Sequence, residues 1–172
     1  MRCTYFVAAS LDGFIADSSG GVDFLKQVEA EGEDYGYQEF YSSVDALIMG
    51  TGTYNSLLKF GVWPYAGKPT YLLSQTVLNP VSDVVLIKEH PARLLSQIYG
   101  AGSKHVWLVG GGKLASTMLA QGLITDIVLS LVPVMLGSGV RLFSGRESRT
   151  TNLTLKNHQV YKSGLIQLHY QL

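Results

Sequence analysis

Three short segments of this sequence combine glycine or hydroxyl residues in a way that suits the binding of phosphate groups. They are MGTGTY at 49–54, LSQT at 73–76 and VGGGKL at 109–114, and each follows an apolar run. A helix that begins directly after glycine-rich backbone directs free N–H groups and its positive dipole end outward, where a phosphate is bound favourably. Serine and threonine hydroxyls add hydrogen bonds. Together the segments predict a site for an extended ligand with more than one phosphate.

The glycine triplet at 110–112 is the clearest of these signals, because glycine loses more conformational freedom on folding than any other residue. A triplet is expected where a backbone φ angle is positive or where a ligand approaches the bare chain. Neither GTGTYN nor GGGKLAS matches the spacing of the dinucleotide fingerprint or of the P-loop. A tight turn is the structural alternative for any one segment, and their recurrence favours a ligand.

Two carboxylates are candidates for proton transfer to or from a substrate. Asp12 lies in LDG at 11–13, directly after the first apolar run, and Asp34 lies near the start of a predicted helix. A carboxyl group beside a reacting atom can donate or accept a proton. Each residue also has a structural alternative, because Asp12-Gly13 is an ordinary turn pair and Asp34 suits an N-cap. Both interpretations stay open at the level of the sequence.

Metal and covalent chemistry find no support in the sequence. The four histidines lack ligand spacing, Cys3 is the only cysteine, and no Gly-x-Ser-x-Gly segment is present. We therefore expect no metal site. The lone cysteine, with no signal-like N-terminal segment and no apolar run of membrane-spanning length, predicts a cytoplasmic protein. Thirteen basic residues balance thirteen acidic ones, which removes the electrostatic argument for a nucleic-acid or membrane partner.

The elements that must position these residues alternate between strand and helix patterns. Predicted strands cover 3–10, 45–50, 69–75, 83–88, 105–109 and 126–134. Predicted helices cover 23–31, 34–44, 53–60, 90–102 and 112–122. The tail, 151–172, alternates around a Lys-Ser-Gly turn and predicts an antiparallel hairpin. Strands that alternate with helices predict right-handed crossovers and a mainly parallel sheet, here made mixed by the hairpin. We expect one three-layer α/β domain over 1–172, with ligands bound beyond the carboxyl ends of the strands.

Taken in order, five segments resemble the dihydrofolate reductase-like family, and within it the reductase domain of bifunctional riboflavin-biosynthesis proteins and its free-standing relatives. The segments are AASLDGFIA (8–16), DYGYQEFYSSVDALIMGTGTY (34–54), YLLSQT (71–76), VWLVGGGKL (106–114) and PVMLGSGVRLF (133–143). The resemblance implies a three-layer αβα dihydrofolate reductase-like fold, with NADPH along the carboxyl edge of the sheet. The zinc motifs of the deaminase half are missing, so at most the reductase step is implied.

The resemblance also assigns cofactor residues segment by segment. The nicotinamide ring would lie on Ala8, Ala9 and Ile15, and the pyrophosphate and the adenosine side would be bound by the loop Gly50, Thr51, Gly52 and Thr53. The adenosine ribose would be bound by Leu73, Ser74, Gln75 and Thr76. The second phosphate-binding helix start comprises Val109, Gly110, Gly111, Gly112, Lys113 and Leu114. In relatives two glycines of the triplet are joined by a cis peptide, which predicts a cis bond between Gly110 and Gly111.

The choice of cofactor depends on basic residues that this sequence lacks at two positions. Relatives often carry Arg in place of Thr51 and a basic residue in place of Gln75, and these pair with the 2′-phosphate of NADPH. Lys113 is the remaining basic candidate. We expect NADPH, with NADH as an open alternative.

The resemblance places the substrate between the end of the first strand and the first major helix. Candidate pocket residues are Tyr35, Phe40, Trp63, Leu136 and Gly137, with core packing as the alternative for the aromatic residues on the helix. The 137–143 segment is also expected to pack Leu142 and Phe143 inward.

The leading functional hypothesis is the NADPH-dependent reduction of a small substrate, such as the ribosylamino-pyrimidinone phosphate of riboflavin biosynthesis. That substrate requires cations, and Arg141, Arg146 and Arg149 lie near the right region. Dihydrofolate reductase activity and a non-catalytic NADP-binding protein are the alternatives. Relatives often pair through their C-terminal strands, so we expect a homodimer.

Overall fold

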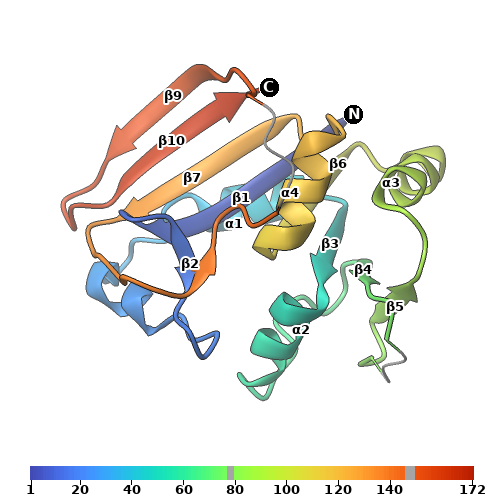
Figure 1. The fold of residues 1–172 in the computed structure, drawn as a ribbon, viewed down its shortest axis with the longest axis horizontal. Helices are drawn as coiled ribbons and strands as arrows, with labels where there is room; N and C mark the ends of the chain where they lie inside the picture. The colour runs from blue at the N-terminus through green and yellow to red at the C-terminus, as the bar shows by residue number, and fades with distance from the viewer. Residues whose placement is uncertain (77–79, 146–149) are drawn as a thin grey trace.

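A computed structural model describes residues 1–76, 80–145 and 150–172, and within them the chain forms a central sheet of eight strands (Figure 1). The strand order is β5-β4-β3-β6-β1-β7-β10-β9. The first six strands are mutually parallel, whereas β10 runs antiparallel to both of its neighbours. The predicted mainly parallel sheet with a C-terminal antiparallel hairpin is confirmed.

The elements follow the predicted alternation closely. The strands are β1 (Arg2–Ser10), β2 (Phe14–Ala16), β3 (Ala46–Gly50), β4 (Thr70–Leu73), β5 (Val84–Ile87), β6 (His105–Gly110), β7 (Asp126–Val132), β8 (Val140–Arg141), β9 (Thr154–Val160) and β10 (Ile166–Gln171). The helices are the 3₁₀ helix η1 (Asp23–Val28) and the α-helices α1 (Tyr37–Ser43), α2 (Thr51–Leu58), α3 (Pro91–Gly100) and α4 (Gly112–Ala120). Strands β2 and β8 form a separate two-stranded ribbon.

Successive side chains of β1 point to opposite faces of the sheet, which divides the core in two. Cys3 and Tyr5 pack with buried residues of α3 and α4 on one face. Phe6 contacts the other face, where the aromatic residues of α1 and buried Tyr54 of α2 cluster around Trp107. Helices α4 and α1 thus lie on opposite sides of the sheet (Figure 1). The three-layer arrangement is confirmed.

The carboxyl ends of four adjacent strands form the edge that the glycine segments predict. Strands β4, β3, β6 and β1 are consecutive neighbours, and their ends lead into 73–76, 50–53, 110–112 and 10–13. Neighbouring strands lie about 4.8 Å apart, so this row spans about 14 Å. That is the length scale of an extended dinucleotide rather than of a single phosphate.

The predicted helix over 23–31 is wrong beyond residue 28. The segment forms only the short η1, and 29–34 (EAEGED) leaves regular structure before α1 begins at Tyr37 instead of at residue 34. Four carboxylates in six residues repel one another along a helix. Gly32 and Gly36 adopt φ angles of +76°, a left-handed conformation that interrupts the helix and turns the chain before α1.

The segment at 137–143 packs as expected. Leu142 and Phe143 contact the core beneath α3 and α4, and the Phe143 ring meets that of Tyr5 edge-on at 5.7 Å. No helix in the described residues is both long and apolar enough to cross a membrane.

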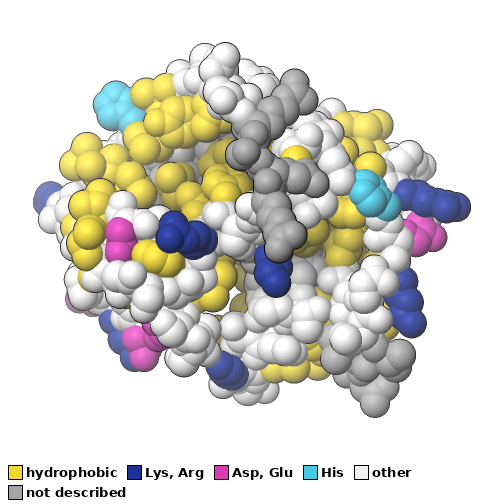
Figure 2. Space-filling view, viewed as in Figure 1, with side chains coloured by type: hydrophobic (Ala, Val, Ile, Leu, Met, Phe, Trp, Pro, Cys, Tyr) yellow, Lys and Arg dark blue, Asp and Glu magenta, His cyan; other side chains and the backbone are white. Residues whose placement is uncertain are grey.

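Strand β9 closes the sheet with an unpaired outer edge, and all seven of its residues are exposed. Leu155 is 48% and Val160 68% exposed, and hydrophobic side chains gather over this hairpin in Figure 2. An apolar strand edge of this kind favours pairing with a second strand. We expect gel filtration to give twice the mass of one chain, and Val160→Lys to shift the protein toward monomer.

The control for that experiment is Val62→Lys. Val62 is 79% exposed in the loop after α2, away from β9, so the same added charge should leave the dimer intact. Wild-type protein that elutes as a monomer at every concentration would refute the dimer.

Candidate active site

A cavity of about 540 Å³ lies beyond the ends of β4 and β5, and we call it the outer cavity. Its lining residues come from the ends of β4 and β5 and from helices α2, α3 and α4: Thr51, Leu73, Ser74, Gln75, Ile87, Lys88, Glu89, His90, Pro91, Leu114 and Thr117. Five of the eleven are predicted cofactor residues, drawn from all three glycine or hydroxyl segments. The structure therefore brings together positions as far apart in sequence as Thr51 and Leu114.

The polar edge of the outer cavity is organised by short local hydrogen bonds. The hydroxyls of Ser74 and Thr76 lie 2.8 Å apart, and the Thr76 N–H donates to Ser74 Oγ at 3.2 Å. Gln75 Nε2 donates to the Lys88 carbonyl at 3.4 Å. These contacts fix a row of hydroxyl and amide groups suited to a ribose.

The basic residues at this cavity are not the predicted one. Lys113 is exposed and does not line the outer cavity, whereas Lys88 and His90 do. Lys88 follows β5 directly, and its position at a carboxyl strand end is the signal that sequence reasoning missed. Of the residues described, Lys88 is the best-placed permanent cation for a 2′-phosphate.

Two helix starts converge beside the outer cavity. Helix α2 follows Gly50 and α4 follows Gly111, and neither cap position receives a side-chain hydrogen bond. A Cβ built on Gly50 would lie 3.9 Å from both the Gly110 carbonyl oxygen and the Gly111 nitrogen. The Thr53 hydroxyl lies 3.1 Å from where a Cβ of Gly110 would stand. The backbone N–H groups of both helix starts thus border one small region, which suits a pyrophosphate.

The predicted cis bond between Gly110 and Gly111 is confirmed. Gly110 has a φ of +148°, and a residue with a side chain would be strained in this backbone conformation. Val109, one residue earlier, packs against the aromatic cluster around Trp107 and does not line the outer cavity.

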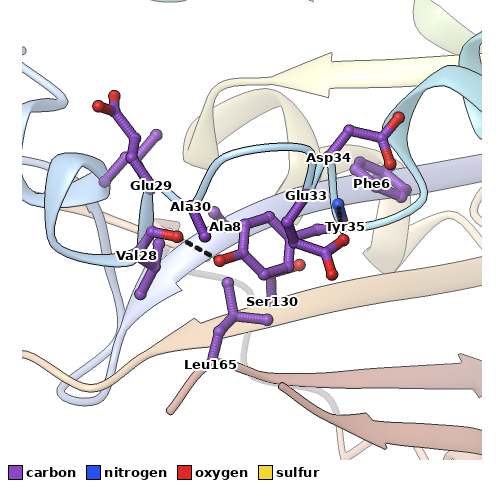
Figure 3. A pocket seen from close by; sticks show the side chains of 11 residues that line it. Phe6, Ala8, Val28, Glu29, Ala30, Glu33, Asp34, Tyr35, Ser130 and Leu165 are labelled. Carbon is purple, nitrogen blue, oxygen red and sulfur yellow. Dashed lines mark hydrogen bonds between the residues drawn. The ribbon is translucent and has the colours of Figure 1, made fainter. Parts of the chain in front are cut away.

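A second cavity, of about 320 Å³, lies against the β1–β7 floor beneath the 29–35 loop, and we call it the central cavity (Figure 3). Its lining comprises Phe6, Ala8, Leu25, Val28, Glu29, Ala30, Glu33, Asp34, Tyr35, Ser130 and Leu165. Ala8 pairs with Ser130 of β7, two residues before β1 ends at Ser10, so the cavity lies close to the carboxyl edge of the sheet. An apolar cavity next to a dinucleotide edge is where a substrate would meet the reactive ring.

Tyr35 lies across the central cavity, as the sequence predicts for a pocket residue. Its hydroxyl donates to the Val28 carbonyl and can accept the Ser163 hydroxyl, whose oxygen lies 3.0 Å away, and its ring meets Tyr161 edge-on. Figure 3 shows the ring between Ala8, Ser130 and Leu165. The loop is thereby tied to η1 and to the β9–β10 turn.

Asp34 also lines the central cavity, and its contacts match the structural alternative as well. Its two carboxylate oxygens accept the N–H groups of Gly36 at 3.0 Å and Gln38 at 2.9 Å, at the start of α1. The side chain is exposed. Asp34 therefore lines the cavity while its carboxylate orders the helix start.

Asp12 occupies a different environment, which favours its structural alternative. Ser10 Oγ donates to it at 2.6 Å, and the N–H groups of Leu136 and Gly137 donate at 3.1 and 2.7 Å. The hydrogen bond from Ser10 is the largest cause that lowers the pKa of the Asp12 carboxyl. The two backbone N–H groups lower this pKa further, and partial desolvation raises it by less than these bonds lower it. A carboxyl held ionised is a poor proton donor. Asp12 anchors the 136–137 loop and does not line the central cavity.

The anchoring role of Asp12 predicts a pH dependence of stability. A folded-state pKa below the unfolded value of about 3.9 stabilises the fold above that pH, and the contribution is lost as pH falls through the folded value. Asp12→Asn removes the charge and presents an amide N–H to backbone donors. We expect the variant to be less stable than wild type at about pH 6, with the gap closing toward about pH 2.

Urea unfolding of both proteins across that range measures the effect. Asp83→Asn serves as the control, because Asp83 is an exposed carboxylate that receives, among the residues described, only a 3.4 Å hydroxyl contact from Ser82. A gap between wild type and Asp12→Asn that is unchanged at acid pH would refute the anchoring role.

Several predicted residues lie outside both cavities. Phe40 stacks on Phe6 at 4.3 Å, and Trp63 packs between Tyr54 and Tyr65. Both rings belong to the aromatic cluster around Trp107, which favours core packing, and their assignment to the substrate pocket stays a prediction. Ala9 is fully buried and Ile15 is half-buried on β2. Leu136 and Gly137 contact Asp12 instead of the cavity.

Ser130, Leu25, Val28 and Leu165 line the central cavity without having been predicted. Ser130 is the one polar side chain in the predicted strand 126–134 that follows Asp126, which is a usable signal. The others come from elements whose contacts depend on tertiary packing.

Known proteins resemble this chain in sequence and in fold. Residues 67–167 match the RibD C-terminal domain family. The uncharacterised protein YwjB of Bacillus subtilis is 32% identical over 171 residues, which cover 98% of this chain and 97% of YwjB. The chain belongs to the RibD C-terminal domain family. The resemblance found in the sequence is therefore confirmed, and this RibD-type domain is reductase-like.

Solved structures agree with that assignment. A candidate riboflavin biosynthesis protein from Shewanella sp. PV-4 superposes with a TM-score of 0.91 at 31% identity, covering 99% of this RibD-type domain and 98% of that chain. A Thermotoga maritima deaminase and 5-amino-6-(5-phosphoribosylamino)uracil reductase superposes at 0.75 with 17% identity, covering 99% of this chain and 56% of that one. The second match, at low identity, shows the shared fold.

Proposed function

We propose that this protein is a reductase that binds NADPH along the carboxyl edge of its sheet and reduces a small substrate in the central cavity. The observation that carries the proposal is the placement of the outer cavity, the two helix starts and the Ala8 side of the central cavity along the carboxyl edge of one sheet. Membership of a reductase-like domain family supports it.

The residues present fit a dinucleotide. The outer cavity offers hydroxyls and an amide to an adenosine ribose, and Lys88 offers a charge to a 2′-phosphate. The N–H groups at the starts of α2 and α4, next to unsubstituted glycine backbone, would hold the pyrophosphate. Ala8 leaves a small side chain where a nicotinamide ring would lie.

When bound, NADPH supplies a hydride to an electrophilic carbon of the substrate, while a proton completes the reduction and NADP⁺ is left. The chain's own residues supply position and proton. The apolar floor and Tyr35 exclude water from a bound ring. Of the three carboxylates that line the cavity, Glu29, Glu33 and Asp34, the sequence resemblance favours Asp34 as the one that relays a proton from solvent.

Calorimetric titration with NADPH and NADH, followed by assay of NADPH oxidation, tests the function. We expect tight binding of NADPH and consumption in the presence of a substrate. Asp34→Asn should then slow turnover more than it weakens NADPH binding. Binding without turnover of any candidate substrate would indicate a non-catalytic NADP-binding protein, and folded protein that binds neither dinucleotide would refute the cofactor assignment.

Lys88 carries a separate prediction about cofactor choice. Replacing it by Gln should weaken NADPH binding about tenfold, because a charged hydrogen bond to phosphate contributes about 1.5 kcal/mol, and should leave NADH binding nearly unchanged. Lys113→Gln is the matched control, since it removes the same charge from a residue outside the outer cavity. Equal losses of NADPH affinity in the two variants would mean that Lys88 does not bind the 2′-phosphate specifically, and that Lys113 or general electrostatics contributes as much.

A further inference from the structure

We propose that the central cavity selects a substrate without a phosphate group, an amino-substituted heterocycle that is neutral or cationic. This inference rests on the proposed function, because it names the class of substrate for that site. It departs from the phosphorylated substrate named for the Thermotoga maritima relative.

The first argument is the charge of the cavity wall. Glu29, Glu33 and Asp34 line it, and no lysine or arginine does so among the described residues. The loop that carries them, 29–34, holds a fourth carboxylate at Glu31 and no basic residue. Lys26, the basic residue nearest in sequence, already pairs with Asp23 at 2.7 Å. A phosphate monoester carries nearly two negative charges at neutral pH and would be repelled by this wall.

The second argument is the pattern of hydrogen-bonding groups. Figure 3 shows the Glu33 side chain beside Tyr35, the Asp34 carboxylate near Phe6 and directed away from the Tyr35 ring, and the Glu29 carboxylate directed away at the far end of the loop. Carboxylates only accept hydrogen bonds, so they favour N–H groups on a ligand. Buried Ser130, 5% exposed, accepts a bond from Gln167 Nε2 at 3.1 Å, and its own hydrogen can be donated to a ring carbonyl or nitrogen.

The third argument is shape and surface. Phe6, Leu25, Val28 and Leu165 supply apolar walls, and the volume of about 320 Å³ suits one ring system with a short substituent. Arg141, which the sequence suggests as a phosphate ligand, is exposed with its guanidinium over the Phe14 ring at 5.3 Å, and it does not line the cavity. Arg146 and Arg149 lie outside the described residues.

A matched pair of compounds tests the inference. The probes are 5-amino-6-(5-phosphoribosylamino)uracil and the same compound after removal of its phosphate. Calorimetry with apo and NADP⁺-loaded protein gives the two affinities, and NADPH oxidation gives the two rates. We expect the dephosphorylated compound to bind about tenfold more tightly or better, with the preference shrinking as salt is raised.

Two variants of one loop make the comparison specific. Glu33→Gln removes a cavity charge but keeps an oxygen that can accept the Tyr35 N–H, which Glu33 Oε1 receives at 2.8 Å. It should reduce the preference about threefold. Glu31→Gln removes the same charge from a residue that does not line the cavity, and it should leave the preference close to that of wild type.

The outcomes separate this inference from the proposed function. Equal or tighter binding of the phosphorylated compound, or no binding of either form, would overturn the inference even if NADPH binds and is oxidised with another substrate. Failure of NADPH to bind would sink the proposed function, while the affinities of the two compounds for apo protein would still decide the substrate class.

Discussion

Gly112→Ala is expected to destabilise the protein by about 3 kcal/mol or more, which is large for the addition of one methyl group. A Cβ on Gly112 would lie 2.0 Å from the Arg141 carbonyl oxygen and 3.0 Å from Ser144 Oγ. The first obstacle is backbone, held by Leu142 N–H donating to the Gly13 carbonyl at 2.8 Å, so it cannot rotate away as a side chain would. Urea unfolding should show a much lower midpoint.

Gly52→Ala is the matched control. Gly52 is also near the start of a helix that follows a glycine turn, but a Cβ there meets nothing within 4 Å. Alanine in a helix is favoured over glycine by about 0.5–1 kcal/mol, so this variant should be as stable as wild type or more so. If both variants unfold alike, the close crossing of 141–144 over the start of α4 is not the reason for Gly112.

The crossing at Gly112 explains a limit of sequence reasoning. The triplet signals correctly that something approaches bare backbone, and the sequence-based interpretation assigns all three glycines to a ligand. The structure divides them: Gly110 and Gly111 border the proposed phosphate region, whereas Gly112 is buried under the chain's own backbone. No local pattern distinguishes a ligand from a segment thirty residues away.

The positions of the strands were more predictable than the pockets. Apolar runs place 105–109 and 126–134 in the sheet, and the rule that ligands bind at carboxyl ends finds five of the eleven residues that line the outer cavity. The same rule, applied to the predicted strand 83–88, would have found Lys88. The acidic loop 29–34 was harder to predict. Phe24 and Val28 of the preceding η1 have helical spacing, which extends the predicted helix, while the repulsion among the loop's carboxylates opposes a helix.

The two predicted carboxylates illustrate why roles need tertiary contacts. Asp12 and Asp34 look equivalent in sequence, each beside a turn or helix start. Only the fold shows that Asp12 binds Ser10 and the distant 136–137 loop, whereas Asp34 binds N–H groups of its own helix start and lines a cavity. Residue type and spacing predict both as catalytic residues, and the long-range hydrogen bonds of Asp12 to Leu136 and Gly137 distinguish its role from that of Asp34.

Thr53→Asp is expected to weaken NADPH binding by about 100-fold, or about 2.7 kcal/mol, without loss of stability. Thr53 is the third residue of α2, and its hydroxyl lies 3.1 and 3.3 Å from where a Cβ of Gly110 and of Gly111 would stand. An added carboxylate would meet the charges of a pyrophosphate placed between the two helix starts. The same carboxylate interacts favourably with the N-terminal end of α2, so thermal stability should stay equal or rise.

Thr53→Asn separates charge from shape, because Asn matches Asp in size and lacks its charge. We expect Asn to weaken binding only severalfold, with calorimetry on NADPH and NADP⁺ giving the same ratio for both forms, since the pyrophosphate is common to them. Opposite effects of Asp on binding and on stability would be hard to obtain from a misfolded protein. Equal affinities in the Asp and Asn variants would place the pyrophosphate elsewhere and remove the central link between the outer cavity and the substrate.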